Sequence, residues 1–208
     1  MDADTFLSDL RADNETPLSR LGSSKSLYAL TGGEMTADAV REAAAAEADA
    51  AADRFEAWSA DEASGDAAAL FGSVAEDARD HREAVAPEGF DPDGTREFPE
   101  YDALAGLKST PARAGGLLAR CVLADARVGQ MVGFFVGSAD PRAADDFRSL
   151  RGDVSDRLDD AADLLDAVCE NDGEWAEARE AADAVLEAAY DDYVETLEGM
   201  GVKPKNVC

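Results

Sequence analysis

The stretch ARAGGLLARCVLADARVGQMVGFFV, residues 112–136, is the longest apolar segment of the chain. It carries Arg113, Arg120, Asp125 and Arg127, which are too many charges for an unsupported membrane span. Its apolar residues recur every three or four positions, which is the spacing of one helix face. Pro111 suits an early position of such a helix. The stretch therefore predicts a helix that is buried among other helices rather than in lipid.

Helical spacing continues on both sides of this stretch. Apolar stripes mark helices that end near residues 63, 85, 170 and 199, and Pro17 starts a shorter helix before them. No segment alternates β-branched and polar residues over a useful length, so we expect no sheet. A connection over residues 88–108, with Gly, Pro and aromatic residues, is typical of a crossing between two helix pairs. We predict an all-α fold of five to seven helices: a four-helix bundle with additional N- and C-terminal helices.

The composition is strongly acidic, with 46 Asp and Glu against 19 Lys and Arg and a formal net charge of -27. Such a surface repels itself unless concentrated salt shortens the Debye length to about 3 Å near 1 M. The charge therefore indicates a halophile, and it argues against direct nucleic-acid binding. No N-terminal stretch joins positive charge to an apolar run, and the three cysteines form no CxxC pair. We expect a cytoplasmic protein with reduced thiols and no membrane attachment.

The chain divides by composition into four parts. We expect an N-terminal extension over residues 1–17, the bundle over 18–170, a helix packed on the bundle over 171–199, and a flexible tail over 200–208. The tail holds two of the four lysines, Lys203 and Lys205, together with Cys208. This tail is either a frayed end or a docking peptide for an acidic partner or another copy of the protein.

Two segments of the first half carry a family resemblance. Residues 24–27 (SKSL) and 30–34 (LTGGE) resemble the opening helix of the ferritin-like domain of rubrerythrins, where a Gly-Glu pair supplies the first iron ligand. Residues 70–81, which include Leu70-Phe71 and AEDARDH, resemble the family segment with an aromatic residue, Ala-Glu and the Glu-x-x-His ligand motif. On this register Glu34 and His81 match ligands, whereas Ala78 replaces the glutamate of Glu-x-x-His.

The second half departs further from that pattern. The pair Phe147-Arg148 resembles the aromatic-Arg pair of the family's fourth helix, but Val154 and Arg157 stand where the second Glu-x-x-His would lie. A carboxylate-bridged di-iron centre takes a Glu from each of two helices and a Glu-x-x-His from each of the other two. The resemblance therefore implies a degenerate member of haloarchaeal type that has lost most di-iron ligands, with Arg157 near the former centre and paired with an acid.

The remaining ligand candidates leave two interpretations of His81, the only histidine. It is either a satisfied core residue, which we favour, or part of a vestigial metal site with Glu34 and Asp77, completed by water. Asp77 lies one helical turn before His81 and would share its face. We expect no cofactor and no catalytic residues.

These observations favour a non-catalytic, ferritin-like interaction or regulatory protein that acts as a homodimer or with a protein partner. One alternative is a residual metal-binding protein with a rubrerythrin-like redox or storage role. Another is a transcription antitermination-type factor that acts through protein contacts, a label that the resemblance brings from similar halophile proteins. Gly129, Gly133 and Gly137 recur every four residues and suit either tight packing within the chain or a dimer seam.

Overall fold

The computed structural model describes residues 1–204, and the predicted all-α class is confirmed for them. These residues form nine α-helices and one 3₁₀ turn, with no strand. Lys205 and Cys208 of the predicted tail lie outside the described residues. The elements are α1 Ala3–Asp13, α2 Glu15–Leu21, α3 Ser24–Leu30, α4 Ala37–Asp61, α5 Gly65–Val85, η1 Pro92–Gly94, α6 Pro99–Gly106, α7 Thr110–Gly137, α8 Pro141–Val168 and α9 Asp172–Gly199.

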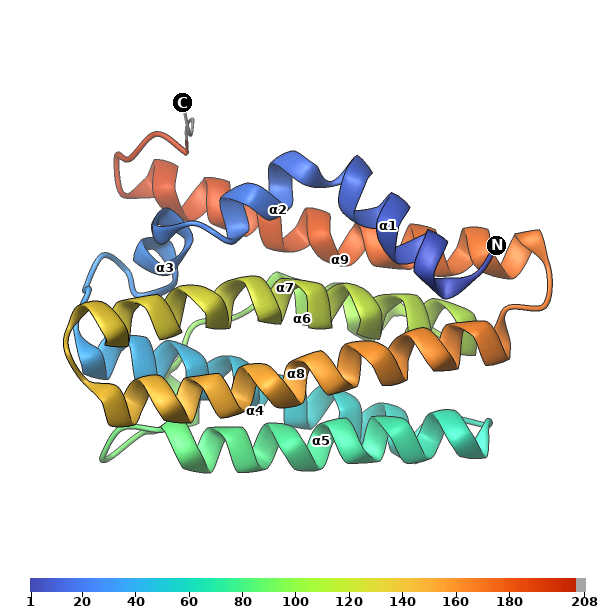
Figure 1. Cartoon of the computed structure of the whole chain (residues 1–208), viewed down its shortest axis with the longest axis horizontal. Coiled ribbons are helices and arrows are strands. Elements are labelled where there is room, and N and C mark those ends of the chain that lie inside the picture. Colours follow the sequence, from blue (N-terminus) through green and yellow to red (C-terminus); the bar gives the residue numbers. More distant parts are fainter. Residues whose placement is uncertain (205–208) are drawn as a thin grey trace.

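Four long helices form the core of the molecule as two antiparallel pairs, α4 with α5 and α7 with α8 (Figure 1). The connection between α5 and α7, which contains η1 and α6, runs the length of the molecule. As a result α5 and α7 point in the same direction. The second pair packs on the first through contacts of α8 with α5 and of α7 with α4.

Local sequence signals set the ends of these helices. Ser109 accepts a hydrogen bond from the backbone of Ala112 and caps α7, and Asp140 caps α8 in the same way ahead of Pro141. Asn171 forms a capping box with Glu174 at the start of α9. Pro111 therefore lies in the first turn of α7, as predicted.

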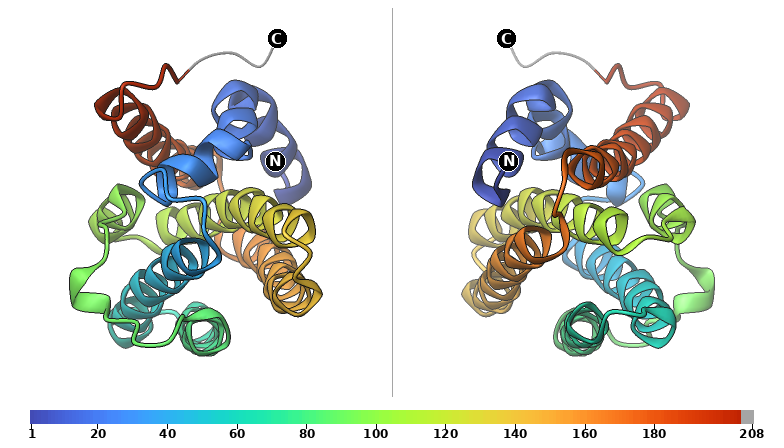
Figure 2. Two further views of the ribbon diagram at one scale, coloured as in Figure 1. Left: turned by 90° about the vertical axis from the view of Figure 1, so that its left-hand side faces the viewer. Right: turned by 90° about the vertical axis from the view of Figure 1, so that its right-hand side faces the viewer.

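A further layer covers α7 on the side away from α4 and α5. Helix α9 packs along α7, and α1, α2 and α3 lie beside α9 (Figure 2). The approach of α7 to α9 is close, because a Cβ atom at Gly115 would lie 2.1 Å from the carbonyl oxygen of Ala178. Helix α7 is thus enclosed by helices on several sides, and 17 of its 28 residues are buried.

The chain contains more helices than the five to seven that its periodicity predicts. The helix expected to start at Pro17 starts at Glu15, is interrupted at Gly22 and becomes α2 and α3, and the connection expected over residues 88–108 contains α6. Gly32 and Gly33 then end the α3 segment with positive φ angles of 58° and 89°. The division of the chain into an extension, a bundle, a packed helix and a tail, with boundaries at residues 17, 170 and 199, stays a prediction.

The two cysteines that the structure describes agree with the expectation of reduced thiols. Cys121 and Cys169 are free thiols and both are buried. In the described part of the chain, no helix has the length and apolar character to cross a membrane.

Candidate functional site

Two of the three predicted metal ligands lie on α5 and face α8. Asp77 accepts a hydrogen bond of 2.6 Å from Arg157 Nε, and His81 Nε2 lies 2.9 Å from Asp153 Oδ2. The expected pairing of Arg157 with an acid is thereby confirmed. Both predicted ligands are engaged by side chains from the opposite helix pair.

The third predicted ligand, Glu34, is not brought to the other two. It lies in the connection between α3 and α4, is exposed, and borders a surface hollow with Glu42 and Arg96. His81 instead borders a cavity inside the helix core. Within residues 1–204, no three His, Cys, Asp or Glu side chains are grouped so that they could hold a metal ion. The vestigial site stays a prediction for a metal titration.

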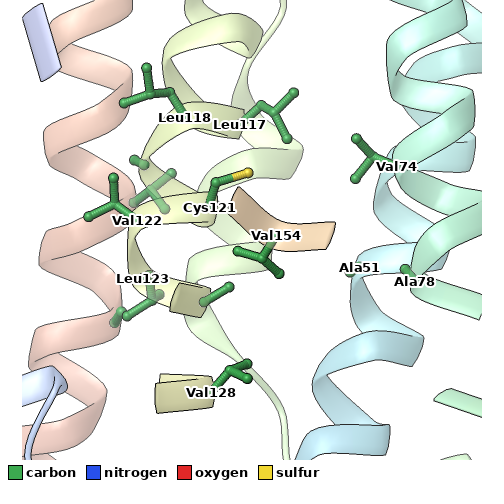
Figure 3. Close-up of a cluster of buried hydrophobic side chains, with 14 of the residues drawn as sticks. Ala51, Val74, Ala78, Leu117, Leu118, Cys121, Val122, Leu123, Val128 and Val154 are labelled. Carbon is green, nitrogen blue, oxygen red and sulfur yellow. The ribbon is translucent and has the colours of Figure 1, made fainter. Parts of the chain in front are cut away.

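The positions at which carboxylates are replaced in the rubrerythrin-like register lie in the apolar core. Ala78 and Val154 are each 2% exposed. Figure 3 shows them with Ala51, Val74 and Cys121 in one cluster of buried side chains between the two helix pairs. This part of the core therefore consists of hydrocarbon and a thiol.

A small cavity lies beside this cluster, where all four core helices meet. Its volume of about 20 Å³ is large enough for one water molecule. Glu47 of α4, His81 of α5, Arg120 and Arg127 of α7 and Val154 of α8 contribute to its wall. Two permanent positive charges therefore border the centre of the bundle.

These charges belong to a row of buried arginines along α7. Arg113, Arg120 and Arg127 are spaced by seven residues, which is nearly two helical turns, so they share one face. They are 4%, 6% and 4% exposed. The spacing was visible in the sequence, but it gave no indication of which acids would pair with the arginines.

Arg120 belongs to a hydrogen-bonded group of three side chains. Its Nη2 lies 3.3 Å from Glu47 Oε1, and its Nε donates to Tyr101 Oη at 3.2 Å. Tyr101 in turn donates to the same Glu47 oxygen at 2.5 Å. Burial raises the pKa of Tyr101 well above its ordinary value, and the charge of Glu47 adds to this, so the phenol stays a neutral donor.

Arg127 is paired with an acid from the crossing connection. Its Nη1 donates to Oε1 of Glu100, a residue of α6 that is 1% exposed. Arg127 also lies over the Phe98 ring, with its guanidinium carbon 6.0 Å from the ring centre. Arg127 Nε and Glu100 Oε2 are buried and have no hydrogen-bond partner among residues 1–204.

Arg113 joins the end of α4 to the start of α7. Its Nη1 lies 3.0 Å from Glu62 Oε2, and its Nη2 lies 2.9 Å from Asp61 Oδ1. Its guanidinium carbon stands 5.5 Å from the centre of the Trp58 ring. The row of arginines thus connects α7 to α4 at two levels and to α6 at a third.

The chemistry of this centre is that of structural pairs. The buried acids of the row each accept from an arginine, whose charge is permanent and supplies no proton. Burial raises the pKa of the Cys121 thiol to about 11, so at neutral pH it is not the nucleophilic thiolate. The arrangement holds α4, α6 and α7 together and offers no pairing of a nucleophile with a free base.

Comparisons with family models, with curated proteins and with solved structures give no match to this chain.

Proposed function

We propose that this protein is a non-catalytic bundle of ferritin-like descent that acts through contacts with proteins, including a second copy of itself, in the cytoplasm of a salt-rich cell. The observation that carries the proposal is the content of the bundle centre. There Glu47, Arg120 and Arg127 border the cavity, in the region where a ferritin-like protein of the resembled family would hold its metals; Arg120 binds Glu47, and Arg127 binds Glu100 of α6.

The charge of these arginines opposes a second role in metal binding. A cation in the cavity would lie beside two guanidinium groups and would compete with them for the carboxylates. Two of the three candidate ligands are also occupied, because Asp77 accepts from Arg157 and His81 lies against Asp153. A bound metal would have to displace several ion pairs at once.

The helix arrangement supports the ferritin-like descent. Two antiparallel pairs joined by a connection that crosses the length of the bundle are the topology that the resemblance implies. The additional helices α1, α2, α3 and α9 cover one side of the second pair and enlarge the surface that partners can contact.

A metal titration separates this proposal from the metal-binding alternative. The purified chain would be incubated with Fe(II) or Zn(II) in molar KCl, desalted and subjected to elemental analysis, alongside His81→Ala and Glu76→Ala. Glu76 is an exposed acid on the same helix and serves as the control. We expect less than one equivalent of metal in all three proteins. Two metal ions per chain that are lost in His81→Ala and kept in Glu76→Ala would overturn the proposal.

The contact with a second copy is tested by molar mass. Light scattering behind a sizing column in molar KCl should give twice the 21.8 kDa of one chain. A mass of one chain at the highest soluble concentration would remove self-association from the proposal and leave contact with other proteins to be sought.

A further inference from the structure

The acids of this chain are spread over nearly its whole length, with a few gaps. Three segments without Asp or Glu matter for the argument, and they are residues 16–33, 126–139 and 199–208. The first gap covers most of α2 and all of α3, the second covers the end of α7, and the third follows α9. Such gaps are unusual in a chain with 46 acids.

The fold brings the three gaps together. Gln130 of α7 donates to the carbonyl oxygen of Gly22 at 2.7 Å, which joins the second gap to the first. The Nζ atom of Lys25 donates to the carbonyl oxygen of Lys203 at 3.2 Å, which joins the first gap to the third. In Figure 1, α3, the end of α7 and the end of α9 lie at the same end of the molecule. We call residues 16–33, 126–139 and 199–204 the acid-free face.

Helix α7 presents an unpartnered stripe on this face. Gly133 and Gly137 are exposed, and a Cβ atom added at either would meet no other atom within 4 Å. Val136 is 54% exposed and is one of three large apolar side chains that are exposed in residues 1–204. Tight packing within the chain therefore does not explain this part of the glycine repeat.

We propose that the acid-free face binds the same face of a second copy, with the two α7 helices in contact along Val132, Gly133, Val136 and Gly137. The proposal rests on the self-association stated above and names its surface. In a two-fold pair the same patch serves both copies, so it must be compatible with itself. A face with small residues and no Asp or Glu in its segments meets this requirement, since glycines let two helix backbones approach closely.

The charge of the chain supports a second copy at this face rather than elsewhere. Each copy carries a net charge of -27, and contact through the acidic helix faces would place carboxylates of both copies side by side. Like charges across an interface cost several kcal/mol. On the acid-free face the charged groups include the cations Arg20, Lys25 and Lys203. Contact through these segments therefore brings fewer carboxylates together than contact through the acidic helix faces.

Two matched glycine substitutions test the proposal. Gly133→Glu places one acid on the acid-free face, and Gly152→Glu places one on α8. Both glycines are exposed within long helices, and a Cβ atom at either meets nothing within 4 Å. Both variants should therefore fold, which melting followed by circular dichroism would verify. Sedimentation equilibrium in molar KCl would then give the dissociation constant of each dimer.

We expect the wild-type chain and Gly152→Glu to form dimers of similar affinity, and Gly133→Glu to weaken dimerisation at least tenfold. A dimer of Gly133→Glu as tight as the wild type would overturn the proposed face while leaving self-association intact. Assemblies that grow beyond two copies would show unlike faces in contact and would overturn the symmetric pairing. A monomeric wild type would remove self-association itself, and the face with it.

Discussion

Helices α7 and α8 are both 28 residues long and pack against each other, yet they differ in their number of acids and in the burial of their arginines. Helix α7 contains one acid and buries three arginines, whereas α8 contains eight acids and carries its arginines at or near the surface. Helix α7 buries 17 residues and α8 buries 8. The difference follows from position, because α9 and its neighbours cover α7 while one side of α8 meets solvent.

The comparison shows that similar ion pairs have different energetic weight in this protein. The arginines of α7 are desolvated and depend on acids supplied by α4 and α6, so the loss of one partner leaves an uncompensated buried charge. Arg148 and Arg151 of α8 make pairs that water and salt screen. Substitutions can measure this contrast from its largest effect to its smallest.

The largest effect is expected at the pair of Arg127 and Glu100. Arg127→Ala leaves the carboxylate of Glu100 buried without its cation and should lower the free energy of unfolding by about 3–5 kcal/mol. Urea denaturation in molar KCl would measure it. The double variant Arg127→Leu with Glu100→Leu removes both charges and should recover most of the loss. A double variant no more stable than Arg127→Ala would show that packing, not the unpaired charge, is the cause.

The close approach of α7 to α9 should give the next largest effect. Gly115→Ala forces a Cβ atom against the backbone of Ala178 and should cost about 1–3 kcal/mol, as overpacked substitutions do. The control is Gly152→Ala on the exposed face of α8, where the same change meets open space. It should stabilise the helix by about 0.5–1 kcal/mol. Equal effects at the two glycines would contradict the packing between α7 and α9.

A smaller effect is expected from Glu47, the acid that pairs with Arg120, on the pH dependence of stability. Burial on its own raises the pKa of Glu47, but the charge of Arg120 and the hydrogen bond from Tyr101 outweigh it, so the pKa lies below its ordinary value of 4.5. A group whose pKa is lower in the folded protein stabilises the fold at pH values above its pKa in the unfolded chain. This stabilisation is lost as the pH falls through its pKa in the folded protein. Wild type should therefore lose more stability than Glu47→Gln below about pH 4.5. The free energy of unfolding of both proteins would be measured from pH 6 to pH 3 in molar KCl. Parallel pH profiles of the wild type and Glu47→Gln would contradict the coupling of Glu47 to the fold.

The smallest effect is expected on α8. Arg151 Nε lies 2.7 Å from Asp125 Oδ1, but both side chains are exposed. Arg151→Ala should change the free energy of unfolding by less than about 1 kcal/mol at low ionic strength, and by less still in molar KCl. A loss in molar salt as large as that of Arg127→Ala would remove the distinction between the two helices.

The sequence predicted those features of the fold that depend on local signals. The helical spacing of residues 112–136 and the early helix position of Pro111 each depend on neighbouring residues, and the structure agrees with both. Helix α6 was missed because its eight residues lie among Gly, Pro and aromatic residues that suggest a loop.

The content of the bundle centre could not be predicted in the same way. Arg120 and Glu47 are 73 residues apart, and Arg127 and Glu100 are 27 apart. Their pairing depends on the path of the crossing connection, which no local pattern specifies. Similarly, the place of Glu34 depends on how the chain turns at Gly32 and Gly33, so the family register alone did not locate it.

The contacts of the N-terminal helices have a consequence for synthesis on the ribosome. Asn14 donates to Asp183, Arg179 pairs with Asp13, and Arg20 donates to Tyr190, so α1 and α2 are held by a helix more than 160 residues later in the chain. The pairs α4 with α5 and α7 with α8 can pack before that helix emerges, because the two helices of each pair contact each other. The first residues to be made are therefore among the last to reach their native places, since contacts between distant parts of a chain form slowly.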